Sequence, residues 1–172
     1  MPTLIEIKAR CHNPENIRQI LQSKNAAYKG RDHQIDTYFK VPAGRLKLRQ
    51  GNIENTLIHY NRNNQTGPKT STVNLYKPKD DEALKNTLLS ALEVLVVVDK
   101  QRYIYFIDNV KFHVDEVMDL GSFVEIEAID DDETIGETKL LAQCQHFMKV
   151  LDIKEEDLID CSYSDLLLEK KN

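Results

Sequence analysis

Residues 45–49 read Arg45-Leu46-Lys47-Leu48-Arg49, in which basic side chains alternate with leucine. Successive side chains of a β-strand point to opposite faces, so a period of two predicts a strand with one apolar face and one basic face. The leucines need a covering layer on their side. The three cations repel one another, so we expect opposite charge close to them.

The same alternation recurs along most of the chain. We predict strands over residues 4–10, 28–40, 45–49, 56–62, 70–77, 94–107, 110–117 and 122–129. Their polar faces carry Glu6, Lys8 and Arg10, then Tyr60 and Arg62, Lys100 and Arg102, His113 and Asp115, and finally Glu125 and Glu127. Most connections between these strands are short, which favours an antiparallel sheet.

Helical patterns occupy the remaining segments. Asn13-Pro14-Glu15 is typical of a helix start, with a capping residue, a proline in the first turn and an acid near the positive end of the dipole. Leucines at helical spacing predict a second helix over 80–92, and apolar residues at spacings near three and four predict a third over 134–151. We therefore expect an α+β fold, with residues 1–172 forming one domain.

The charged faces of the strands allow two interpretations. If about eight strands close into a barrel, the charged face becomes the lumen, which must stay wet or hold a ligand. A polyphosphate would then satisfy the basic rows. A divalent metal would satisfy Glu125 and Glu127, because Mg²⁺ and Mn²⁺ favour carboxylate oxygen. A one-sided sheet with helices behind it gives the same alternation, and periodicity alone favours this simpler interpretation.

Composition narrows the class of partner. The net charge is -5 over 172 residues, which argues against a general nucleic-acid binder. The three cysteines show no metal-binding spacing, so we expect reduced thiols. The N-terminus lacks the pattern of a signal peptide, and the longest apolar run, 94–98, is too short to span a bilayer. We expect a cytoplasmic protein that does not bind membranes.

A series of short motifs follows in order between residues 5 and 167. The motifs are Ile5-Glu6-Ile7-Lys8, Gln34-Ile35-Asp36-Thr37-Tyr38-Phe39, Gly44-Arg45-Leu46-Lys47-Leu48-Arg49, Tyr60-Asn61-Arg62, Gly67-Pro68-Lys69-Thr70-Ser71, Val97-Val98-Asp99-Lys100-Gln101-Arg102, His113-Val114-Asp115-Glu116-Val117, Leu120-Gly121-Ser122-Phe123-Val124-Glu125-Ile126-Glu127 and Ser162-Tyr163-Ser164-Asp165-Leu166-Leu167. Each motif is short, but the ordered series resembles the CYTH family of triphosphate tunnel metalloenzymes. It is most similar to the class IV adenylyl cyclase-like branch.

The resemblance implies an eight-stranded antiparallel β-barrel, or tunnel, with helices packed outside, which binds a triphosphate with Mg²⁺ or Mn²⁺. The implied catalytic residues are Lys8, Lys100, Arg102 and Asp115. The implied substrate-binding residues are Arg45, Lys47, Arg49, Arg62 and Tyr163, and the implied metal ligands are Glu6, Glu125 and Glu127. Members of this branch are often dimers, so a homodimer is an expectation that rests on the resemblance alone.

The chain departs from the family at one position. The family signature begins E-x-E-x-K, whereas this sequence has Leu4 in place of the first glutamate. The resemblance implies conversion of ATP to cyclic AMP and pyrophosphate. Two alternatives stay open: a triphosphatase acting on thiamine triphosphate, tripolyphosphate or nucleotides, and a module that binds polyphosphate or a nucleotide without turnover. The lost carboxylate favours the binding module.

Overall fold

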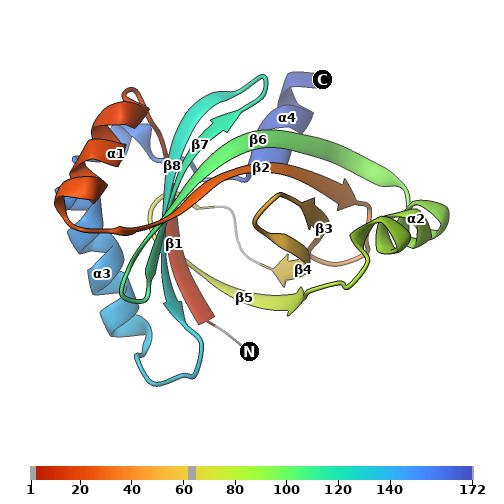
Figure 1. Ribbon diagram of the computed structural model, residues 1–172, viewed down its shortest axis with the longest axis horizontal. Coiled ribbons are helices and arrows are strands. Elements are labelled where there is room, and N and C mark those ends of the chain that lie inside the picture. Colours follow the sequence, from red (N-terminus) through yellow and green to blue (C-terminus); the bar gives the residue numbers. More distant parts are fainter. Residues whose placement is uncertain (1–2, 62–64, 172) are drawn as a thin grey trace.

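A computed structural model describes residues 3–61 and 65–171 (Figure 1). Its strands are β1 (Thr3–Arg10), β2 (Ala27–Phe39), β3 (Arg45–Gln50), β4 (Asn55–Asn61), β5 (Lys69–Tyr76), β6 (Val94–Ile107), β7 (Val110–Val117) and β8 (Gly121–Asp130). Its helices are α1 (Pro14–Ser23), α2 (Asp81–Ala91), α3 (Glu137–Val150) and α4 (Tyr163–Lys171), with a 3-10 turn, η1 (Glu155–Asp157). The predicted elements are therefore present, with small differences at their ends.

The strands close into one barrel in the order β1-β5-β4-β3-β2-β6-β7-β8, and each neighbouring pair is antiparallel. The first strand completes the ring, because β1 pairs with β5 on one side and with β8 on the other. This closure confirms the barrel interpretation and excludes the one-sided sheet.

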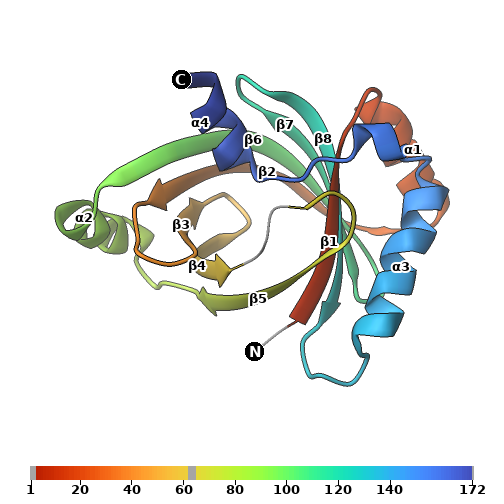
Figure 2. The same cartoon turned by 180° about the vertical axis from the view of Figure 1, so that it is seen from behind.

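The largest hydrophobic core lies outside the barrel, between the outward faces of its strands and two helices. α1 and α3 lie side by side along this wall in both views (Figures 1 and 2). The strands contribute Ile5, Ile7, Ala9, Val110, Phe112, Val114, Val124, Ile126 and Ala128, and the helices contribute Ile17, Leu21, Leu140 and Cys144. These strand residues alternate with the charged ones, so the barrel wall has an apolar outer face and a polar inner face.

A second core uses the inner face of the barrel. Residues Val96, Val98, Val117 and Phe123 share that face and pack with Tyr163 and Leu167 of α4. α4 therefore covers the lumen at one end of the barrel, beside β6. The sequence pattern gave no element type for this segment.

The turn into β3 requires glycine. Gly44 has a φ of 68°, in the left-handed region that side chains disfavour, and a Cβ at this position would lie 2.6 Å from the Tyr60 carbonyl oxygen. A residue with a side chain would displace β3 from β4 at this end.

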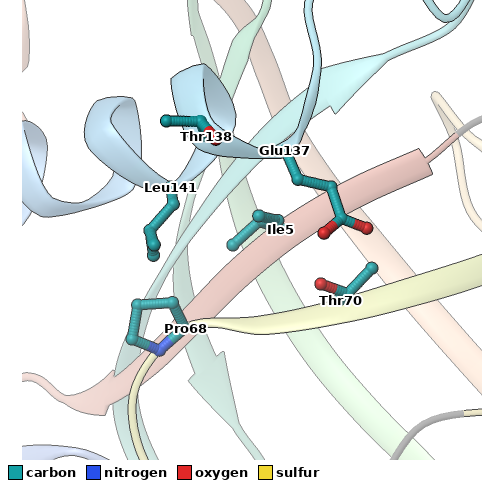
Figure 3. Close-up of a pocket in the computed structure, with 6 residues that line it drawn as sticks. All are labelled: Ile5, Pro68, Thr70, Glu137, Thr138 and Leu141. Carbon is teal, nitrogen blue, oxygen red and sulfur yellow. The ribbon is translucent and has the colours of Figure 1, made fainter.

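A small pocket of about 240 Å³ lies on the outer wall, away from the lumen. It is lined by Ile5, Pro68, Thr70, Glu137, Thr138 and Leu141 (Figure 3). Its strand residues belong to the outward faces of β1 and β5, so it does not connect to the charged interior. Among the described residues, the helices are too short or too polar for any of them to cross a membrane.

Candidate functional site

The strand register determines which side chains face the lumen, because directly paired residues project to the same face of the sheet. Lys8 pairs with Glu125, Glu125 with His113, and Asp115 with Arg102. Following the pairs around the barrel, the lumen-facing residues from the sequence prediction are Glu6, Lys8, Arg45, Lys47, Arg49, Lys100, Arg102, Asp115, Glu125 and Glu127. Arg62 lies outside the described residues.

One wall of the lumen, made by β2, β3 and β6, is dominated by cations around Asp36. Arg49 donates two hydrogen bonds to the Asp36 carboxylate, at 2.9 and 2.8 Å, and Lys100 donates a third at 2.7 Å. The ammonium of Lys47 lies 3.4 Å from the same carboxylate. Burial opposes ionisation of Asp36, but Arg49 and Lys100 outweigh it and hold its pKa well below the usual range. Three cations thus surround Asp36, and Arg49 also lies 3.5 Å from Glu54, so these cations still outnumber their carboxylate partners when all are protonated.

Lys100 is the cation whose charge depends most on its surroundings. Its side chain is 1% exposed. Burial, together with the positive charges of the nearby Arg49 and Arg102, lowers its pKa to about 7, against the opposing attraction of Asp36. Lys100 is therefore only partly protonated at neutral pH, and an anion bound beside it would favour the charged form.

The facing wall, made by β7, β8 and β1, carries most of the carboxylates. Arg102 donates two hydrogen bonds to Asp115, at 2.8 and 2.7 Å, and a third to Glu125 at 3.2 Å. The Lys8 ammonium lies 3.8 Å from Glu125. Burial opposes ionisation of Glu125, but Lys8 and Arg102 bring its pKa well below the ordinary value. Both Asp115 and Glu125 are therefore charged at neutral pH.

A divalent cation fits between three side chains of this wall. His113, Glu125 and Glu127 each offer one ligand atom, and these atoms lie within 4.8 Å of one another. Glu6, the other predicted metal ligand, is the direct register partner of Glu127. His113 was not among the metal ligands that the resemblance implied. It is buried, and neither ring nitrogen makes a hydrogen bond to the described part of the chain.

The start of α4 contacts both walls of the lumen. The Tyr163 hydroxyl donates a 2.7 Å hydrogen bond to Asp115, and the Lys8 ammonium lies 4.0 Å from the centre of the Tyr163 ring. Asp165 accepts a 2.8 Å hydrogen bond from Arg45 at the rim. The structure therefore brings Tyr163 to the lumen, as the resemblance implied, and fastens α4 there through charged groups.

Several lumen residues were missing from the predicted site. Asp36 is the most important, and its alternation with Tyr38 on the polar face of β2 was a usable signal. Lys111 shares a face with His113 and forms a salt bridge with Glu54. Glu54 lies in the connection before β4, where no periodicity marks it. Sequence alone gives no reason to pair it with a strand so far along the chain.

Leu4, the departure from the family signature, faces the lumen two residues before Glu6. It packs against a small apolar cluster of lumen-facing residues, namely Ile58, Tyr60 and Val73. Position 4, which carries a glutamate in the family signature, therefore belongs to an apolar cluster in this protein. A metal bound near Glu6 has one oxygen ligand fewer available on this side.

The fold is shared with several solved structures. The PH1012 protein from Pyrococcus horikoshii has a TM-score of 0.79 and 25% identity, over 95% of this chain and 98% of that one. A candidate adenylate cyclase from Vibrio parahaemolyticus has a TM-score of 0.79 and 17% identity, covering 96% and 97%. HpAC1 from Hippeastrum, described as having a dominant triphosphatase activity, has a TM-score of 0.63 and 14% identity, covering 98% and 95%.

No curated protein matches the chain by sequence. The likenesses to the Vibrio and Hippeastrum proteins fall below 25% identity and concern the fold alone. The family comparison is more direct, because the model of the CYTH domain matches residues 3–163. That match includes every strand of the barrel and the lumen residues described above. The chain belongs to the CYTH domain family.

Proposed function

We propose that this protein is a metal-dependent enzyme that binds a triphosphate in the barrel lumen and cleaves one of its phosphoanhydride bonds. The observation that carries the proposal is the division of the lumen into a cationic wall around Asp36 and a carboxylate wall at Glu125 and Glu127. β3 and β8 stand four places apart in the eight-stranded ring, so these walls face each other. A polyanion carrying a divalent cation matches both.

Each wall has a distinct part in this scheme. Lys47, Arg49 and Lys100 would hold phosphate oxygens and stabilise the negative charge that builds up as the bond breaks. Glu125 and Glu127, with Glu6 beside them, would hold Mg²⁺ or Mn²⁺. When bound, the cation would neutralise phosphate charge and polarise the phosphorus under attack. Arg102 and Lys8 keep Glu125 ionised and oriented.

The choice of bond depends on the attacking group. In an adenylyl cyclase the ribose 3′-hydroxyl attacks the α-phosphorus and pyrophosphate leaves. In a triphosphatase, water attacks the terminal phosphorus, the remaining diphosphate leaves, and the attacked phosphoryl group is released as orthophosphate. Both reactions depend on positioning and charge neutralisation more than on a protein nucleophile. The sequence resemblance favours the cyclase, and we take it as the first reaction to test.

One observation favours a binding module instead. Leu4 places an apolar side chain where the family signature has a carboxylate, and it packs into an apolar cluster. A weaker metal site would preserve binding of the polyanion by the cationic wall while slowing the chemical step.

The deciding experiment supplies ATP, thiamine triphosphate and tripolyphosphate separately, each with Mg²⁺ or Mn²⁺, and identifies the products. Cyclic AMP with pyrophosphate establishes the cyclase, and orthophosphate establishes the triphosphatase. Binding of the triphosphate with neither product establishes the module and contradicts the proposed enzyme.

A matched pair of lysine variants locates the reaction in the lumen. Lys47→Met removes a lumen cation whose side chain is 14% exposed, whereas Lys40→Met removes a surface cation whose side chain is 57% exposed. We expect the first to lower kcat/KM about 100-fold, the usual order for one charge-stabilising donor, and the second to leave it unchanged. Equal effects of the two variants would place the reaction elsewhere.

A further inference from the structure

We propose that the imidazole of His113 binds the lumen metal together with Glu125 and Glu127, so that the site prefers Mn²⁺ or another first-row transition ion to Mg²⁺. The inference deepens the proposed function and rests on its assumption that a metal binds in the lumen. It differs from the sequence prediction, which assigned the ligands to carboxylates alone.

The first support is the state of the His113 ring. The side chain is 2% exposed, and neither ring nitrogen has a hydrogen-bond partner among residues 3–61 and 65–171. Buried polar atoms in proteins almost always have a partner, because leaving one unpaired costs about 1 to 3 kcal/mol. The imidazole faces the charged lumen, with Nδ1 near two glutamate oxygens but without a hydrogen bond at either nitrogen, and this arrangement indicates a bound group.

The second support is the spacing of the ligand atoms. Nδ1 of His113 lies 3.5 Å from one oxygen of Glu125 and 3.4 Å from one oxygen of Glu127. An ion that binds two atoms at about 2.1 Å each holds them about 3 to 3.4 Å apart in octahedral or tetrahedral geometry. The observed separations are close to that range, so only small rotations are needed to bind an ion.

The third support is that the two carboxylate oxygens of Glu125 have different neighbours. Its Oε1 accepts the hydrogen bond from Arg102 and lies near Lys8, while its Oε2 is the atom that faces His113. One oxygen is thus engaged by cations of the protein, and the other is directed toward the space beside the imidazole. The direct register pair between His113 and Glu125 fixes their backbones on adjacent strands.

The chemistry of this donor set gives the metal preference. Mg²⁺ binds carboxylate, phosphate and water oxygens, whereas an imidazole nitrogen suits first-row transition ions. Leu4 removes a carboxylate from one side of the site, and His113 adds a nitrogen on the other. The metal site therefore offers a mixed set of nitrogen and oxygen ligands instead of oxygen ligands alone.

The test uses electron spin-echo spectroscopy on the full-length protein loaded with Mn²⁺, prepared with ¹⁴N-histidine and again with ¹⁵N-histidine. We expect a nitrogen coupling that changes with the isotope, which identifies a histidine ligand without any mutation. Absence of this coupling in protein that binds Mn²⁺ overturns the inference and leaves the proposed function intact. Failure to bind Mn²⁺ or Mg²⁺, with or without tripolyphosphate, overturns both.

Two variants assign the coupling to a residue. His113→Gln removes the nitrogen, and His33→Gln changes a surface histidine on β2 that pairs with Asp99 at 2.8 Å. We expect His113→Gln to lose the coupling, to weaken Mn²⁺ binding by calorimetry about tenfold or more, and to bring the Mn²⁺ and Mg²⁺ affinities closer together. Retention of the nitrogen coupling in a folded His113→Gln protein overturns the assignment to His113. If that variant does not fold, the His33→Gln protein decides. Retention of the coupling there supports the assignment to His113, and loss of the coupling contradicts it.

Discussion

Asp36 and Arg49 join β2 to β3 through two parallel hydrogen bonds, at 2.9 and 2.8 Å, inside the barrel. Asp36 is fully buried and also accepts a hydrogen bond from Lys100. The protein thus supplies part of the counter-charge for its own cations and leaves the rest to a ligand. We therefore expect Asp36 to affect both the stability of the protein and its affinity for anions.

Replacing Asp36 should separate these two effects. Asp36→Asn removes the carboxylate partner of the buried Lys100 and leaves Arg49 only Glu54, at 3.5 Å, so we expect a loss of about 3 to 5 kcal/mol in the free energy of unfolding. Tripolyphosphate should restore more stability to this variant than to the wild type, because the anion replaces the missing charge. Urea unfolding with and without tripolyphosphate measures both quantities.

Glu93→Gln is the control for that experiment. Glu93 pairs with Lys40 on the surface, where both side chains are exposed. We expect no measurable change in unfolding and no added response to tripolyphosphate. An Asp36→Asn protein as stable as this control would show that the cationic wall does not need its internal carboxylate.

The pKa of Lys100, about 7, predicts proton uptake when an anion binds. Above pH 7 the free protein has lost much of this proton, and a bound phosphate would draw it back. Affinity for tripolyphosphate should therefore fall as pH rises above 7. Calorimetry at pH 8 in buffers of different ionisation enthalpy measures the protons taken up, and Lys100→Arg should take up fewer because arginine stays charged.

The lowered pKa of Lys100 also affects the stability of the protein. Because the pKa of Lys100 is lower in the folded protein than its ordinary value of 10.5, the unfolded chain binds more protons between these values. The Lys100 contribution should therefore make the free protein more stable as pH rises from about 7 toward 10.5. For anion binding, an equal pH dependence in the wild type and in Lys100→Arg would show that Lys100 is not the group that takes up the proton.

Leu4→Glu tests the departure from the family signature. A carboxylate beside Ile58, Tyr60 and Val73 should lower the free energy of unfolding by about 1 to 3 kcal/mol, because it replaces an apolar contact. Leu4→Gln is the matched control of similar size. Mn²⁺ should restore stability to the glutamate variant more than to the glutamine variant, and turnover should rise only with glutamate. The same response in both variants would show that position 4 does not reach the metal.

Asp165→Asn tests whether the Asp165–Arg45 ion pair holds α4 against the barrel. Asp165 accepts a 2.8 Å hydrogen bond from Arg45. Burial opposes ionisation of Asp165, but the hydrogen bond and the positive charge of Arg45 outweigh burial, so the pKa of Asp165 is lowered. We expect faster hydrogen exchange of the α4 amides in the variant, with the barrel strands unchanged. In the wild type, α4 should also loosen as pH falls through the lowered pKa. Glu169→Gln, on the exposed side of α4, should change neither.

Much of the barrel follows from local pattern, and the site follows only in part. The alternation around Lys47 and Glu125 fixes which side chains share a face, because the strand period is two whatever the partner strand is. The partnerships of Asp36 with Lys100 and of His113 with two glutamates depend on strand order and register. These properties arise between distant segments, so no single stretch of sequence contains them. The helix at 163–171 was missed for a similar reason, since it packs onto a surface that exists only in the closed barrel.

The position of β1 between β5 and β8 has a consequence for how the chain folds. Its Leu4 and Glu6 pair with β5 through Ser71 and Lys69, while its partners on β8 are separated from it by more than a hundred residues of chain. Ring closure therefore waits for β8 to emerge during synthesis, and such long-range pairing slows folding. Until then, the first strand is an open edge that other chains could join, and newly made protein should be most prone to aggregate at this stage.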